Sequence, residues 1–374
     1  MAIKRGVSLY SYQQSQFFKE LDLEAQIREV GQNLHGAEGI EIIDEMSLRY
    51  PDPGEDFTRR WFEWMDAYGT TPVAMDVGMD VLQFRDHVMT IEECADRLRH
   101  DITLAKSLGF PNVRVLSVVP VEVLTSALPY AEELDIRLGK EVHQPMPLEG
   151  QQVTEILDVI ERTGTRHLGI VPDLGIFQFR PSEVLLASLE RRGAKKAASD
   201  ASVELAIRLQ RGEAPFGHID MSFHTAGNLR ADFNRFLKSG ACDDTFVEAF
   251  TGVKEYTEEH VEDPQDVDYR AASEALMLSH TSGDTLRELA PHVVHVHGKF
   301  NNMSPVPDRP GEFLEISIDY ATAIRALKEG GFDGYINSEY EGQRYFQDRG
   351  REDMMDEVDQ VRRHQEMLRR LLSA

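Results

Sequence analysis

The chain has 374 residues, 41% of them apolar, which is enough for one large α/β barrel or for two medium domains. Its 65 acidic residues outnumber its 40 basic residues and give a formal net charge of −25, which argues against a nucleic-acid partner because phosphates attract clusters of Lys and Arg. The chain has two cysteines without metal-type spacing, no signal peptide before the first strand and no apolar run approaching about 18 residues, so we expect a cytoplasmic protein without disulfides or a membrane anchor.

Eight apolar segments that read as β-strands follow one another along the chain. They lie at about 5–10, 39–44, 71–77, 112–118, 135–143, 167–174, 292–298 and 334–339. Amphipathic segments with near-helical spacing separate most of them, for example at 91–107 and 151–162, and a last one lies at roughly 351–372. A strand followed by a helix, repeated to eight, predicts a single (β/α)8 TIM barrel over residues 1–374.

The spacing between strands is irregular in one place. The predicted sixth strand ends near residue 174 and the seventh begins near 292, whereas a barrel needs only about 30 residues per strand and helix. The extra segment, about 180–290, is rich in helical patterns and charge. Because it follows a strand's C-terminal end, we interpret it as a helical insertion on the catalytic face, either a lid or a partner-docking surface. Extra packing around the barrel is the alternative.

Potential metal ligands recur on the inward faces of the last four strands. Strand alternation points Glu141 and His143 toward the barrel axis, and it does the same for His297 and Glu339, while Asp173 follows the sixth apolar run. Burying so many charges would cost several kcal/mol each, and a divalent cation is the simplest compensation. Carboxylates with one imidazole suit Mn²⁺ or Mg²⁺ better than a structural zinc. The predicted ligands are Glu141, Asp173, His297 and Glu339.

Each of these residues also has a purely structural interpretation. Asp173 could be an N-cap or turn residue. His295 and His297 could be hydrogen-bonded core histidines, and His143 could orient a ligand without touching the metal. Lys299 could merely neutralise a carboxylate. Glu339 and Glu341 could pair with Arg344 or Arg349. Four successive strand ends with ligand-type side chains nevertheless favour a metal site.

The constellation resembles the xylose-isomerase-like barrels, a broad family of sugar isomerases and epimerases. In that family the metal is held by Glu, Asp, His and Glu from successive strand ends, which correspond here to the four predicted ligands. The long segment between Asp173 and His297 departs from simple ketohexose epimerases, which lack such an insertion. Residues 140–145 (Lys-Glu-Val-His-Gln-Pro) and 337–344 (Asn-Ser-Glu-Tyr-Glu-Gly-Gln-Arg) are more specifically similar to the α (catalytic) subunit of bacterial C-glycoside deglycosidases.

The resemblance implies a metal-dependent carbon–carbon lyase that cleaves the C-glycosidic bond of 3″-dehydro-C-glucosides. The C3 carbonyl acidifies the C2 proton, and the metal stabilises the enolate as a Lewis acid. His143 is expected to remove that proton, because an imidazole titrates near neutrality. The products would be the aglycone and a 1,2-unsaturated 3-keto sugar. The expected catalytic residues are His143, Glu141 and Glu339. The expected substrate-binding residues are Lys299, Asn337, Arg344 and His295.

The resemblance also implies a separate small β subunit in a hetero-oligomer, and Mn²⁺ ahead of Mg²⁺, Co²⁺ or Zn²⁺. The main alternative is a ketose or sugar-phosphate isomerase or epimerase that uses the same metal-stabilised enolate, with Glu141 and Glu339 shuttling protons. An apurinic-site endonuclease would need more zinc ligands and a basic DNA-facing surface, which the net charge disfavours. A sugar-binding barrel without catalysis is the non-enzyme alternative, and the intact ligand set argues against it.

Overall fold

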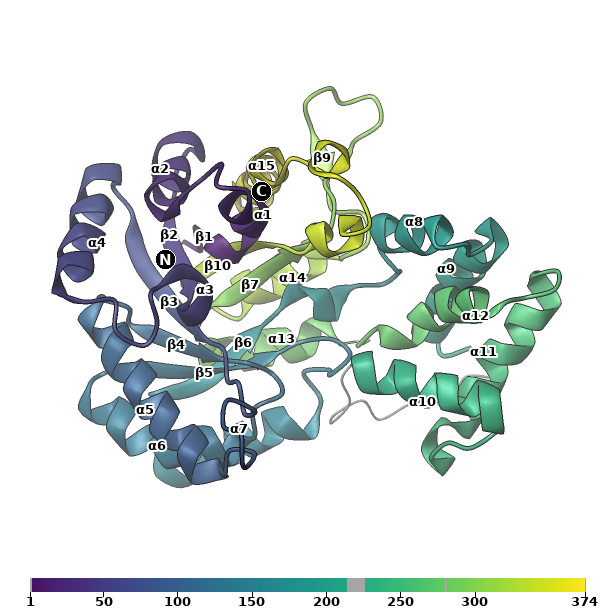
Figure 1. Ribbon diagram of the computed structural model, residues 1–374, viewed down its shortest axis with the longest axis horizontal. Helices are drawn as coiled ribbons and strands as arrows, with labels where there is room; N and C mark the ends of the chain where they lie inside the picture. The colour runs from purple at the N-terminus through teal and green to yellow at the C-terminus, as the bar shows by residue number, and fades with distance from the viewer. Residues whose placement is uncertain (1, 214–225, 280, 374) are drawn as a thin grey trace.

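The computed structural model describes residues 2–213, 226–279 and 281–373 (Figure 1). Eight parallel strands form a barrel, and a two-stranded hairpin lies after the seventh of them. The barrel strands are β1 (Lys4–Ser8), β2 (Ala37–Ile43), β3 (Thr71–Val77), β4 (Asn112–Val115), β5 (Arg137–Val142), β6 (Leu168–Pro172), β7 (Val296–Phe300) and β10 (Tyr335–Tyr340), and the hairpin strands are β8 (Ser304–Pro305) and β9 (Phe313–Leu314).

Helices follow most of the strands and cover the outside of the barrel (Figure 1). They are α1 (Gln13–Phe17), α2 (Leu23–Asn33), α3 (Asp44–Ser47), α4 (Glu55–Tyr68), α5 (Ile91–Ser107), α6 (Val121–Glu133), α7 (Gln151–Thr163), α8 (Glu183–Arg191), α9 (Lys196–Gln210), α10 (Ala226–Ser239), α11 (Val247–His260), α12 (Asp266–Ala272), α13 (Gly283–Leu289), α14 (Tyr320–Glu329) and α15 (Glu357–Ser373).

The sheet is closed everywhere except at one seam. The strands pair in parallel in the order β6-β5-β4-β3-β2-β1-β10-β7. Between β7 and β6 the contact is reduced to two single bridges, Ile170 with Val293 and Asp173 with His297. The predicted (β/α)8 barrel is therefore confirmed, and all eight predicted strands are present. The long insertion leaves the barrel at this seam.

The helices form where the sequence combines capping residues with an apolar stripe. Helix α5 starts with a capping box, in which Thr90 and Glu93 satisfy each other's backbone N–H groups. Its Leu98 and Ile102 are fully buried against the barrel. Helix α7 ends at Gly164, whose positive φ of 68° gives the left-handed turn that glycine adopts without strain.

Two element boundaries are shifted from the sequence-based expectation, and one hairpin was not expected. Strand β7 begins at Val296 rather than near 292, because residues Ala290–His292 form a 3-10 helix, η5, ahead of it. Helix α15 begins at Glu357 rather than near 351, because Arg351–Asp353 form another short 3-10 helix, η7. The hairpin of β8 and β9 was not expected, since strands of two residues are too short to give a periodic signal.

Helices α8 to α12, which lie between β6 and β7, gather to one side of the barrel (Figure 1). Helices α9, α10 and α11 share an apolar cluster that includes Leu205, Phe233 and Phe250. Arg191 at the end of α8 anchors this group to the segment after β10, because its guanidinium donates to the Tyr345 carbonyl at 2.5 Å. Of the segment expected to be an insertion, 180–290, residues 214–225 and 280 lie outside the described residues. Among all the residues that the structure describes, no helix is both long and apolar enough to span a membrane.

Candidate functional site

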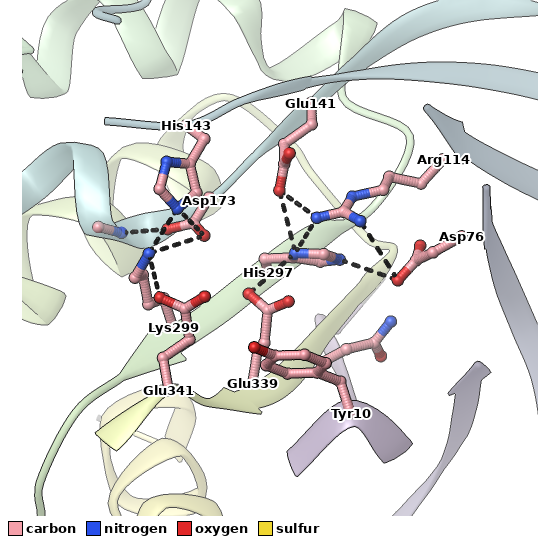
Figure 2. A network of polar contacts seen from close by, with 12 residues as sticks. Tyr10, Asp76, Arg114, Glu141, His143, Asp173, His297, Lys299, Glu339 and Glu341 are labelled. Atoms are coloured by element: carbon pink, nitrogen blue, oxygen red, sulfur yellow. Dashed lines mark hydrogen bonds and ion pairs between the residues drawn. The ribbon is translucent and has the colours of Figure 1, made fainter. Parts of the chain in front are cut away.

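The four residues predicted to hold a metal converge at the C-terminal end of the barrel (Figure 2). They are Glu141 on β5, Asp173 after β6, His297 on β7 and Glu339 on β10, and each exposes no more than 5% of its surface. One potential ligand atom from each of Glu141, Asp173 and His297 lies within 4.8 Å of the other two. The fourth residue joins them through Glu339 Oε2, which lies 3.1 Å from His297 Nδ1.

Both oxygens of Glu141 have protein partners. Arg114 on β4 donates from Nη2 to Glu141 Oε1, and the backbone N–H of Ser117 donates to Oε2 at 3.1 Å. Burial alone would raise the pKa of Glu141, but the Arg114 guanidinium outweighs burial and brings that pKa down to about 2. Glu141 is therefore an anion held in one orientation at neutral pH.

The loop that carries Ser117 is fixed by a second buried cation. Lys140 on β5 points away from the ligand cluster, and its ammonium donates to the carbonyls of Leu116, Ser117 and Val119, the first at 3.1 Å. Burial lowers the pKa of Lys140 to about 7. Adjacent residues of one strand thus act together, because Lys140 holds the loop that in turn holds Glu141.

Asp173 combines its structural and its predicted metal-binding roles. Its Oδ1 accepts the Gly175 N–H at 2.6 Å and caps the 3-10 helix η2 (Leu174–Phe177). Its Oδ2 is fully buried and has no hydrogen-bond partner among the described residues, although Lys299 Nζ and His143 Nε2 each lie 3.7 Å away. Burial raises the pKa of Asp173, against the pull of Lys299. One oxygen is therefore left to face the cluster.

His143 points into the site from just beyond β5 (Figure 2). Its Nδ1 lies 2.6 Å from the Gln144 carbonyl oxygen, which can only accept, so Nδ1 carries the proton. Its Nε2 then presents a lone pair, which faces Lys299 Nζ at 2.6 Å. Burial would lower the pKa of Lys299, but Asp173 and Glu341 outweigh burial and raise it, so Lys299 is an ammonium group.

Glu341 links this group to the rim of the barrel. It pairs with Lys299 at 2.5 Å and with Arg344, whose side chain is 41% exposed. Arg344 also donates to the Tyr10 hydroxyl at 3.3 Å. Lys299 and Arg344, both expected to bind substrate, therefore lie in one chain of charges between His143 and the solvent. Lys299 does neutralise a carboxylate, and Glu341, not Glu339, is the partner of Arg344.

His295 and Asn337, also expected to bind substrate, lie in a layer beneath the ligand cluster. Both are fully buried and both contact Glu41, a buried residue of β2. His295 Nε2 lies 3.1 Å from Glu41 Oε2, and Asn337 donates to the same oxygen. Burial lowers the pKa of His295. Their contact with substrate stays a prediction.

Three residues of the site were missed by sequence reasoning: Glu41, Asp76 on β3 and Arg114. Arg114 Nη1 lies 3.6 Å from Asp76 Oδ2, and its Nη2 lies 3.5 Å from His297 Nδ1. All three residues are ionisable side chains inside otherwise apolar strands, such as Asn-Val-Arg-Val in β4. That interruption is the signal that could have found them, because a charge on a buried strand face needs a partner inside the barrel.

The donor set fits a divalent cation. His297 is surrounded by carboxylates, and although burial would lower its pKa, Glu339 and Glu41 outweigh burial and raise that pKa well above its usual value. Asp173 Oδ2 is buried without a hydrogen bond. Three carboxylates and one imidazole form a largely hard ligand set that suits Mn²⁺, Mg²⁺, Co²⁺ or Zn²⁺. The cluster can therefore bind a divalent metal ion.

Known proteins resemble the chain over most of its length, although no protein-family model matches it. The "3′-dehydrocarminate deglycosidase alpha subunit" of Microbacterium sp is 30% identical over 339 residues, which are 90% of this chain and 88% of that protein. A "C-glycoside deglycosidase alpha subunit" of Arthrobacter globiformis is 26% identical over 372 residues, 99% of this chain and 92% of that relative.

A solved structure of D-psicose 3-epimerase, determined in the presence of D-fructose, superposes on the whole chain. The TM-score is 0.52, and the superposition covers 100% of both chains at 12% sequence identity. Such a distant likeness shows a shared barrel fold and carries no conclusion about the reaction.

The Arg114 guanidinium is expected to be the main protein group that stabilises the buried carboxylates. Arg114→Met should lower the free energy of unfolding by about 3–5 kcal/mol at pH 7 in the presence of a chelator, because it leaves Glu141 unpaired in the interior. The low folded-state pKa of Glu141 contributes stability above its unfolded value near 4.5, and this contribution is lost as the pH falls toward 2. The deficit should therefore shrink as the pH is lowered.

Chemical denaturation at pH 7 and at about pH 3.5, inside the window between the unfolded and folded pKa values of Glu141, measures this difference. Arg59→Met is the matched control, since Arg59 is 65% exposed and pairs with the exposed Asp56, so its loss should change stability little. An Arg114→Met protein as stable as the control variant at pH 7 would contradict the assignment.

Proposed function

The chain belongs to the family of C-glycoside deglycosidase α subunits, and we propose that it is a metal-dependent carbon–carbon lyase that cleaves the C-glycosidic bond of 3″-dehydro-C-glucosides. The observation that carries the proposal is the placement of His143. Its Nε2 faces Lys299 Nζ at 2.6 Å and lies 3.7 Å from Asp173 Oδ2 of the buried ligand cluster. A base therefore stands next to the residues that could hold a divalent cation.

The chemistry of the substrate explains why a base beside a cation is needed. An aryl carbon is a poor leaving group, so paired carboxylates that hydrolyse O-glycosides cannot break this bond. A carbonyl at C3 of the sugar makes the neighbouring C2 proton acidic. A divalent cation bound at the cluster supplies Lewis acidity for the negative charge that develops on the C3 oxygen.

His143 supplies the proton transfer in this proposal. Its Nδ1 proton is held by the Gln144 carbonyl, so Nε2 is the atom that accepts the C2 proton. The C1–aryl bond then breaks, its electron pair takes up a proton at the aryl carbon, and a C1–C2 double bond forms. The imidazolium that forms at His143 is stabilised by Asp173, and Glu341 compensates the neighbouring Lys299.

The expected substrate contacts follow from the same arrangement. Lys299 and Arg344 lie between the base and the solvent, so we propose that they orient the hydroxyl groups of the sugar. Glu141 and Glu339 act as ligands and not as acids or bases. In the epimerase alternative Glu141 would have to shuttle a proton, but both of its oxygens are engaged by Arg114 and Ser117, which favours the lyase.

We propose Mn²⁺ as the metal, because oxygen-rich sites of this kind accept it readily, with Mg²⁺, Co²⁺ and Zn²⁺ as alternatives. We also propose a cytoplasmic location, which agrees with the two free cysteines.

His143→Ala should lower the rate of aglycone release from a 3-dehydro-C-glucoside by about 10²- to 10⁴-fold, the usual contribution of a general base. The metal content should stay unchanged, because His143 is outside the ligand set. Aglycone release by chromatography and metal content by elemental analysis measure the two effects. His167→Ala is the matched control, since His167 lies just before β6, at the opposite end of the barrel, and pairs with the exposed Asp135. Wild-type turnover in His143→Ala would remove this residue from the base role.

A second subunit is proposed because both relatives are named α subunits. Exposed apolar side chains follow β3 and β4 at the catalytic end, and we propose that the small partner covers them: Leu82 is 69% exposed, Val88 60% and Val118 62%. Protein purified from its native source should therefore form a complex heavier than the 42.4 kDa chain and yield a second, smaller polypeptide. Active enzyme that contains this chain alone would contradict the proposal.

A further inference from the structure

Glu41 reaches across the barrel to the predicted metal ligand His297. It comes from β2, it is fully buried, and its Oε1 lies 2.7 Å from His297 Nε2. The other nitrogen of the ring, Nδ1, faces the opposite way, 3.1 Å from Glu339 Oε2 and 3.7 Å from Glu141 Oε1. Nε2 of His297 thus faces the polar layer that contains Glu41, and Nδ1 faces the ligand cluster.

We propose that Glu41 is a positioning residue of the metal site: it holds the Nε2 proton of His297 and so directs the Nδ1 lone pair at the cation. A carboxylate can only accept, so a nitrogen at hydrogen-bond distance from it carries the proton. A ring that keeps its Nε2 proton while bound to a metal offers Nδ1 as the ligand atom. Such a partner also fixes the ring's rotation and raises its basicity as a ligand.

Further contacts keep Glu41 itself in place. Its Oε2 accepts from Asn337 and lies 3.1 Å from His295 Nε2. All of these side chains are fully buried. Glu41 is therefore fixed through Oε2, whereas Oε1 and His297 Nε2 lie 2.7 Å apart and neither makes a regular hydrogen bond to any residue that the structure describes. Turning the carboxylate away would leave the buried groups around Oε2 unpaired, at a cost of about 1–3 kcal/mol for each group. This gives a role to the otherwise unexplained polar layer beneath the metal site.

The same layer could be mistaken for a second cation site, since Glu41, Asp76, His295 and His297 lie close together. The geometry points to a proton instead. Ligand atoms that share a tetrahedral cation at about 2.0–2.2 Å lie more than about 3.2 Å apart, whereas His297 Nε2 and Glu41 Oε1 are 2.7 Å apart.

The inference rests on the metal site of the proposed function, and Mn²⁺ affinity tests it without any substrate. Glu41→Gln keeps the size of the side chain but removes its charge, and its amide nitrogen can stabilise the wrong tautomer of His297. Asp76→Asn removes one negative charge from the same layer, where Asp76 is 4.0 Å from His297 Nε2. Both variants therefore lose whatever Mn²⁺ affinity comes from the removed negative charge alone.

We expect Glu41→Gln to bind Mn²⁺ about 10- to 100-fold more weakly than Asp76→Asn, the range measured for partners of metal-binding histidines. Isothermal titration calorimetry gives the affinities and the stoichiometry, with one ion per chain expected. The visible spectrum of the Co²⁺ form should change in Glu41→Gln and stay as in the wild type in Asp76→Asn. Equal affinities of the two variants would overturn the inference.

Two further results keep the test decisive. If Glu41→Gln does not fold, Glu41→Asp retains the charge but withdraws the carboxylate from His297, and wild-type affinity in that variant would overturn the inference. Two ions per chain in the wild type, falling to one in Asp76→Asn, would also overturn it. A wild-type protein that binds no Mn²⁺, Mg²⁺, Co²⁺ or Zn²⁺ would remove the proposed function together with the inference, whereas the other outcomes leave that function intact.

Discussion

Compensation of buried negative charge is the constraint on which the rest of this molecule depends. Five buried carboxylates lie around His297 and a sixth, Glu341, lies beside Lys299; the described cations that face them are Arg114, Lys299 and, at the rim, Arg344. An uncompensated carboxylate in the interior costs several kcal/mol. The interior is stable only if each carboxylate has a cation, a proton or a set of donors. The carboxylates that the protein's own cations do not neutralise form the proposed metal site. The neighbouring His143 is the proposed base at that site.

The seam of the barrel connects this constraint to the fold. Between β6 and β7 the sheet is reduced to single bridges, one of which joins Asp173 to His297. The chain leaves the barrel after β6 and returns before β7, so both ends of the helical segment are connected to the barrel near Asp173 and His297. Its anchor to the segment after β10, through Arg191, keeps this segment close to the catalytic end. The position of Asp173 relative to His297 therefore depends on the single bridge at this seam.

Sequence periodicity predicted the barrel because strand alternation and helical spacing are local properties. The convergence of Glu141, Asp173, His297 and Glu339 could also be predicted, since parallel strands bring their C-terminal ends together. Glu41 could not be assigned, because its partners His297 and Asn337 lie on β7 and β10, and pairing between distant strands is set by the closure of the sheet. Arg114 was missed although its partners Asp76 and Glu141 lie on the neighbouring strands β3 and β5. The short hairpin and the shifted start of β7 depend on local turns that carry no periodic signal.

Hydrogen exchange at the sugar is the most direct test of the central claim, that this site removes a proton next to a carbonyl and expels an aryl carbon. The Mn²⁺-loaded protein, with its partner subunit, would be given a 3-dehydro-C-glucoside in D₂O, and a panel of free ketoses in parallel. We predict deuterium at C2 of the unreacted 3-dehydro-C-glucoside that is recovered, together with release of the aglycone. Exchange confined to a free ketose, with formation of its epimer, would contradict the claim and identify a sugar epimerase.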